Sequence, residues 1–169
     1  MDYLVIVLRL VHILSGVFWV GSSLFVGMFL TPAMAANPES APKYMAFLIT
    51  KSRLTVKIAS AAILTVLAGG TLYWIDSQGL TSGWTSSGPG WGFGIGALFG
   101  LIGLVFGLLV GLHSTRIGNV AAQIQGKPTN EQMQIIQGSQ KQLAVVGPIS
   151  TVAIVLALIC MATARYWRF

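Results

Sequence analysis

Four long apolar stretches divide the chain, and they constrain its fold more than any other feature of the sequence. They cover about residues 3–31, 54–75, 91–112 and 143–164, and each is near or above the roughly 20 apolar residues that a helix needs to cross a bilayer. Only 8% of the residues are charged, whereas a soluble domain carries about 25%. The sequence therefore predicts an all-α integral membrane protein, an antiparallel four-helix transmembrane bundle formed by a single domain over residues 1–169.

The connections carry their own helical signals. The segment between the third and fourth stretches is polar and rich in glutamine, yet it keeps a helical period. We expect residues 113–142 to form a helical hairpin on the cytoplasmic side, interrupted near Pro128. Thr129 followed by Gln132 has the pattern of a capping box, which predicts the start of the last helix. A turn follows the first stretch, and the second helix is expected to begin near Ser40, before its apolar part.

The charges indicate an orientation rather than a nucleic-acid partner. The chain has ten Lys and Arg residues and only four Asp and Glu residues, but the basic residues are spread singly beside the apolar stretches. Seven of the ten flank the first and third connections and three lie near the chain ends, so the positive-inside rule predicts both termini on the outer side. No Asp or Glu lies within a stretch, which disfavours a proton-coupled transporter. The single cysteine, Cys160, excludes an internal disulfide and a cysteine-based metal cage.

His12 is the leading candidate for a functional residue, because an ionisable side chain inside a membrane span is costly and rare. It lies roughly 13 Å below the start of the first stretch, close to the middle of a bilayer. Gly16, Ser23 and Gly27 follow it on the same helical face, with Trp19 near that stripe. Two interpretations remain open: His12 binds a ligand, or the small residues allow close helix packing and His12 bonds across the bundle.

The third stretch is unusually rich in glycine, with ladders of four-residue spacing. Such ladders let helix backbones approach closely. The missing side chains around Gly100, Gly103 and Gly107 could also make room for a planar macrocycle between helices. Packing alone accounts for the pattern equally well, so the composition leaves both interpretations open.

The second histidine, His113, lies too deep to pair with His12. Counting residues separates the two by roughly 10 to 20 Å along the bundle axis, whereas the two axial ligands of one haem lie close together across the iron. His113 and Arg116 are therefore expected at the inner membrane interface, and a ligand role for His113 is the less favoured alternative.

Three basic residues are candidates for binding either anionic lipid or the carboxylates of a ligand. Arg53 and Lys57 are four residues apart and would share one face of the second helix at its inner end. Arg9 precedes His12 by three residues on the outer side. The sequence does not choose among them.

The first stretch also resembles a known motif. Residues 10–23, with His12, Gly16, Trp19, Gly21 and Ser23, match the first-helix signature H-x-x-x-G-x-x-W-x-G-x-S. We associate this signature with a loose superfamily of small helical membrane proteins. It includes CopD-type copper-resistance proteins, HemJ-type protoporphyrinogen oxidases and the membrane domain of PuuD-type urate oxidases. Pro32, and Arg53 followed by an apolar run that ends at Ala68-Gly69-Gly70, are similar too.

In that superfamily the first-helix histidine is implicated in binding haem b, so the resemblance implies His12 as the iron ligand. Gly16, Trp19 and the glycines of the third stretch would then shape the cavity, and Arg9 or the Arg53/Lys57 pair would bind the propionates. The chain departs from the pattern in two ways. It has no intramembrane lysine like that of HemJ-type oxidases unless Lys57 serves, and it has no outer Met/His cluster suited to a copper path.

The expected function is that of a haem b-binding membrane protein involved in electron transfer or porphyrin-linked redox chemistry. If it is an enzyme, it is a membrane oxidoreductase. The alternative is a cofactor-free accessory subunit packed within a larger membrane complex, and passage of a metal ion or small solute ranks last. The expected partners are the lipid bilayer and either further copies of the chain or other subunits, without nucleic acid. The expected location is a bacterial cytoplasmic membrane.

Overall fold

The structure is a computed structural model that describes residues 2–168, so residues 1 and 169 of the predicted single domain lie outside the described part. In this part the chain forms helices joined by short links, with no strand. The elements are α1 (Asp2–Phe25), η1 (Val26–Leu30), α2 (Thr31–Ala36), α3 (Ala41–Ala46), η2 (Phe47–Lys51), α4 (Leu54–Asp76), η3 (Gly83–Ser86), α5 (Gly88–Gln123), α6 (Asn130–Thr163) and η4 (Ala164–Tyr166). The prediction of an all-α chain is confirmed.

Within residues 2–168, four helices are long and apolar enough to cross a membrane: Tyr3–Ala36, Leu54–Asp76, Gly88–Gln123 and Asn130–Tyr166. The first combines α1, η1 and α2 into one rod. Helices α5 and α6 run without interruption from the apolar stretches into the polar segment between them. A non-helical link of residues 124–129 joins them, at the position of the predicted interruption.

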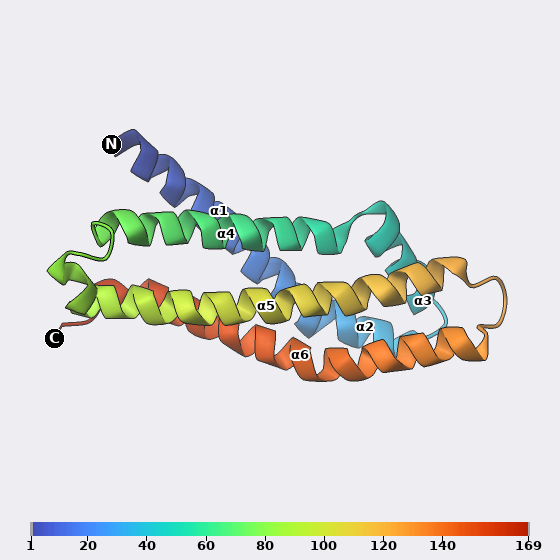
Figure 1. The fold of residues 1–169 in the computed structure, drawn as a ribbon. Helices are drawn as coiled ribbons and strands as arrows, with labels where there is room; N and C mark the ends of the chain where they lie inside the picture. The colour runs from blue at the N-terminus through green and yellow to red at the C-terminus, as the bar shows by residue number, and fades with distance from the viewer. Residues whose placement is uncertain (1, 169) are drawn as a thin grey trace.

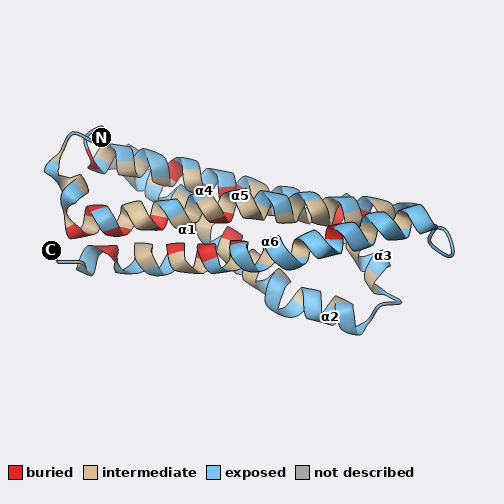
Figure 2. Ribbon diagram, turned by 60° about the horizontal axis from the view of Figure 1, so that its bottom comes forward, coloured by how far each residue is buried: buried red, intermediate tan, exposed pale blue. Residues whose placement is uncertain are grey.

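The helices lie against one another in chain order (Figure 1). The most extensive contact is between α5 and α6, and α4 packs against α5. Helix α1 crosses α4 obliquely and meets α6 over a short length. A small core fills this crossing, where Trp19 is 5% exposed and Ile154 1% exposed, together with Ala61 and Ala62. Most of the other residues are exposed or only partly buried, and exposed residues are most frequent on α1 and α2 (Figure 2).

Glycines bring α5 and α6 close together. A Cβ at Gly96 would lie 2.8 Å from the Met161 side chain, and one at Gly103 only 2.5 Å from the Ile154 Cγ2. The Ser150 hydroxyl donates a hydrogen bond of 3.2 Å to the Gly103 carbonyl oxygen. The ladder therefore serves packing between α5 and α6 at these positions.

Replacing Gly103 with alanine is expected to destabilise the protein by about 1 to 3 kcal/mol, because the added methyl group overpacks the α5–α6 interface. The measurement is the midpoint of thermal unfolding in detergent. Gly100→Ala is the matched control, since a Cβ at Gly100 would meet nothing within 4 Å, and alanine favours a helix over glycine. Equal stability of the two variants would contradict the packing argument.

The sequence predicted that the second long helix begins near Ser40, but in the structure this helix, α4, begins at Leu54. The segment starts with α3 and η2 but breaks before α4, because Arg53 adopts a left-handed backbone conformation with φ of 51°. The break lets Ile49 pack against α5, where a Cβ at Gly118 would lie 2.5 Å from the Ile49 Cβ. Arg53 therefore precedes α4 instead of sharing a helix with Lys57.

The predicted capping box is confirmed at the start of α6. The Gln132 backbone N–H donates to the Thr129 hydroxyl at 3.2 Å, and the Thr129 backbone N–H donates to the Gln132 side-chain oxygen at 2.9 Å. The two bonds satisfy N–H groups that the first turn of a helix leaves without partners.

Candidate functional site

His12 lies where α1 crosses α4, and its ring is held by the backbone of α4. Its Nδ1 is 2.8 Å from the carbonyl oxygen of Thr65. A carbonyl oxygen only accepts hydrogen bonds, so Nδ1 carries a proton, and in the neutral form of the ring Nε2 keeps its lone pair. Within residues 2–168, Nε2 has no hydrogen-bond partner. The neutral imidazole therefore presents an uncommitted nitrogen donor.

Gly69 leaves the space that the His12 ring needs to reach the Thr65 carbonyl. In an α-helix the carbonyl of Thr65 points toward residue 69, one turn further along. A Cβ at Gly69 would lie 2.7 Å from the His12 Cε1 and 2.8 Å from its Nδ1. Only glycine leaves this space to the imidazole, so Thr65 supplies the acceptor and Gly69 supplies the room.

A second polar contact supports the same crossing. The Ser15 and Thr65 hydroxyl oxygens are 2.8 Å apart, and the Thr65 hydroxyl also donates to the Ala61 carbonyl oxygen at 2.8 Å. A Cβ at Gly16 would lie 3.4 Å from the Thr65 Cγ2, so a small residue here allows close approach. The spacing of residues 12, 15 and 16 places all three on the face of α1 that meets α4.

The rest of the predicted α1 stripe behaves differently. Trp19 is buried among Ala61, Ala62 and Ile154, so its indole fills the core of the crossing. A Cβ at Gly27 would meet nothing within 4 Å. Gly16 and Trp19 of the stripe therefore pack against other helices, whereas Gly27, in η1, does not.

The α5 glycines do not lie beside His12. Gly103 packs against Ile154 of α6, and a Cβ at Gly107 would lie 3.4 Å from the Ser150 hydroxyl, also on α6. Gly100 has open space within 4 Å of its Cβ position. Among these three, the structure brings none into contact with the imidazole.

The two histidines, His12 in α1 and His113 in α5, lie at different heights along the neighbouring helix α4. His12 bonds to Thr65, whereas Thr115, two residues beyond His113, has its hydroxyl oxygen 3.2 Å from that of Thr55. Ten residues of α4, about 15 Å at the helical rise, separate Thr55 from Thr65. Because α5 runs back along α4 (Figure 1), His113 lies about 3 Å nearer the level of Thr65 than Thr115 does, which leaves about 12 Å between the two histidines. The Nδ1 of His113 is buried without a hydrogen-bond partner within the described residues. At this separation the two rings cannot bind one iron.

The basic candidates also differ in their distance from the imidazole. Arg9 is exposed and lies three residues from His12, about 4.5 Å along α1. Lys57 is exposed and lies eight residues from Thr65, about 12 Å along α4. Arg53 is exposed and lies one turn further away. Arg9 is therefore the nearest of the three cations to His12 along its helix.

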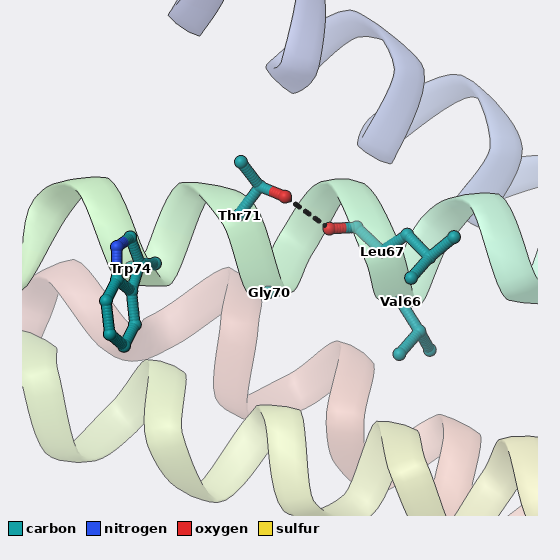
Figure 3. Close-up of a pocket in the computed structure, with 5 residues that line it drawn as sticks. All are labelled: Val66, Leu67, Gly70, Thr71 and Trp74. Atoms are coloured by element: carbon teal, nitrogen blue, oxygen red, sulfur yellow. Dashed lines mark hydrogen bonds between the residues drawn. The ribbon is translucent and has the colours of Figure 1, made fainter. Parts of the chain in front are cut away.

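A shallow open groove lies elsewhere on α4 (Figure 3). Val66, Leu67, Gly70, Thr71 and Trp74 line it, and the Thr71 hydroxyl donates to the Leu67 carbonyl oxygen at 2.9 Å. None of the five has a hydrogen bond to the His12 ring. In the part of the chain that the structure describes, no group of three or more His, Cys, Asp or Glu side chains could hold a metal ion.

Sequence reasoning named His12 and Gly16 but not the residues of α4 that hold the imidazole. The sequence carried a usable signal, because Thr65 and Gly69 are spaced by one helical turn and an intramembrane histidine needs an acceptor. What it lacked was the register of α1 against α4.

Comparisons with protein-family models, with curated proteins and with solved structures found no significant match to this chain.

Proposed function

We propose that this protein binds haem b through His12 and takes part in electron transfer or porphyrin-linked redox chemistry. The observation that carries the proposal is the state of the imidazole, with Nδ1–H donated to the Thr65 carbonyl and Nε2 without a partner. A histidine that ligates a metal almost always donates its other ring N–H to a carboxylate, a carbonyl or water. His12 therefore fits the axial ligand of a haem iron.

The surrounding residues have distinct roles in this proposal. Thr65 and Gly69 hold the ring and its tautomer, and Gly16 keeps α1 close to α4. Arg9 is the nearest exposed cation for a propionate carboxylate. Bound haem would supply a reversible one-electron change at its iron. If the protein catalyses a reaction, we place it among the membrane oxidoreductases.

The proposal includes a membrane setting. The four apolar helices would form an antiparallel bundle across a bacterial cytoplasmic membrane with both termini outside. The course of the chain in Figure 1 supports this, because each of the long helices returns toward the end where the previous one began. The concentration of Lys and Arg in the first and third connections supports the orientation.

The test is a reduced-minus-oxidised visible spectrum of the detergent-purified protein, with haem measured per chain. We expect the bands of a b-type haem at about one haem per chain, because the chain offers one such imidazole. A folded, colourless protein, also after incubation with haemin, would contradict the proposal.

A cofactor-free accessory subunit is the second candidate. The large exposed apolar surface of α1 and the glycine-packed α5–α6 interface favour it, because α1 could pack against other subunits. This alternative predicts a colourless protein that co-purifies with larger membrane partners.

A further inference from the structure

Five cations gather where the first connection meets α5. Ile49 of η2 packs at Gly118, and the hydroxyl of Thr55 lies 3.2 Å from that of Thr115. These contacts hold the start of α4 and the segment before it beside the polar part of α5. We call the exposed basic residues of this region the basic collar: Lys43, Lys51, Arg53, Lys57 and Arg116.

The basic collar is not neutralised within the protein. All five side chains are exposed, and none has an ion pair within residues 2–168. Glu39 is the only acidic residue between positions 3 and 75 of the sequence. Asp76 ends α4 at its opposite end. The collar therefore keeps its full positive charge available for an external anion.

The backbone turn at Arg53 shapes the collar. The segment η2, which precedes Arg53, packs against α5. Because Arg53 has a φ of 51°, the chain changes direction there before it enters α4. Lys51 and Arg53 consequently lie on the turn, and Lys57 lies on the first part of α4. On a straight helix from Ser40, Lys43 and Lys57 would lie about 21 Å apart along the axis.

Exposed aromatic side chains accompany the cations. Tyr44 is 63% exposed and Phe47 59% exposed, and both belong to the same segment as Lys43 and Lys51. Tyrosine is enriched at the level of lipid headgroups, and exposed apolar rings insert there. Cations next to such rings suit a phosphate-bearing lipid surface better than a dissolved ion.

We propose that the basic collar binds the headgroups of anionic phospholipids. The cations would bind phosphate and the neighbouring rings would lie at the boundary with the acyl chains. This inference does not rest on haem binding, since no collar residue has a hydrogen bond to His12 or to Thr65.

The test uses the full chain in detergent and short-chain lipids as soluble probes. Dioctanoyl phosphatidylglycerol is titrated into the protein, with dioctanoyl phosphatidylcholine as the neutral comparison. We expect tighter binding of phosphatidylglycerol that weakens as salt is raised. In a Lys51→Gln/Arg53→Asn variant its affinity should fall by roughly 30-fold, at about 1 kcal/mol per cation near a charged surface. Asparagine is chosen at position 53 because it tolerates the left-handed conformation.

Arg165→Gln/Arg168→Gln is the matched control, because it removes two exposed cations at the opposite end of the molecule. This control should keep the affinity of the wild-type protein. A Lys51→Arg/Arg53→Lys variant, which keeps the charges, should also bind phosphatidylglycerol and so separates charge from folding. Equal binding of both lipids, an equal loss in the control, or full competition by inorganic phosphate would each overturn the proposal.

Discussion

His12→Ala is expected to remove the haem absorption bands from the purified protein, lowering the haem content by about tenfold or more. The substitution deletes the imidazole whose Nδ1 is held by the Thr65 carbonyl, and the second histidine lies about 12 Å away along α4, too far to replace it. The measurement is the pyridine haemochrome assay together with the reduced-minus-oxidised spectrum. Wild-type protein and variant are expressed and purified in parallel.

His113→Ala is the control for this experiment and should keep the haem content of the wild-type protein. Adding imidazole to His12→Ala should restore part of the spectrum, because a free imidazole can occupy the position of the lost ring. If the spectrum of His12→Ala equals that of the wild type, His12 is not the ligand. If His113→Ala loses haem instead, the assignment of the two histidines is reversed.

Gly69→Ala is expected to disturb the imidazole directly, with or without a cofactor. The new Cβ would lie 2.7 Å from the His12 Cε1, so either the ring moves off the Thr65 carbonyl or α1 separates from α4. We expect a loss of stability of about 1 to 3 kcal/mol from overpacking. In the haem-loaded protein we also expect a shifted spectrum and weaker haem retention, because the ligand is displaced. Thermal unfolding and visible spectroscopy measure the two effects.

Two comparisons isolate the contact between Gly69 and His12. Gly70→Ala places the same methyl group on the next residue of α4, where it would meet nothing within 4 Å, so it should not destabilise the protein. In a His12→Ala background the clash disappears, and Gly69→Ala should cost little. The coupling energy of this double-mutant cycle tests the contact without reference to haem. Additive effects of the two substitutions would contradict the geometry.

The helices of this fold could be predicted because local patterns determine them. Apolar stretches of spanning length predicted the four long helices, and Thr129 with Gln132 predicted the start of α6. The break at Arg53 could not be predicted, since arginine has no intrinsic preference for a positive φ and the accompanying contact of Ile49 with Gly118 joins segments far apart in the sequence.

Only the α1 side of the candidate site could be predicted from the sequence. The cost of an intramembrane histidine singled out His12, but its partners Thr65 and Gly69 depend on how α1 crosses α4. The glycine ladder shows a related limit. Its spacing indicates close packing without saying against which helix, and the structure places α6 against Gly103.

If the proposed haem protein spans a bilayer, the unbroken length of α5 limits where a redox partner could dock. Its 36 residues make a rod of about 54 Å, against about 30 Å of hydrocarbon in a bilayer. In the proposed membrane setting, about 20 Å of α5 would therefore stand outside the hydrocarbon, and with α6 it would form a stalk. A protein docked at the tip of this stalk would be held away from the imidazole. A redox partner of the proposed haem protein would thus have to approach His12 from the opposite end of the bundle or from within the plane of the membrane.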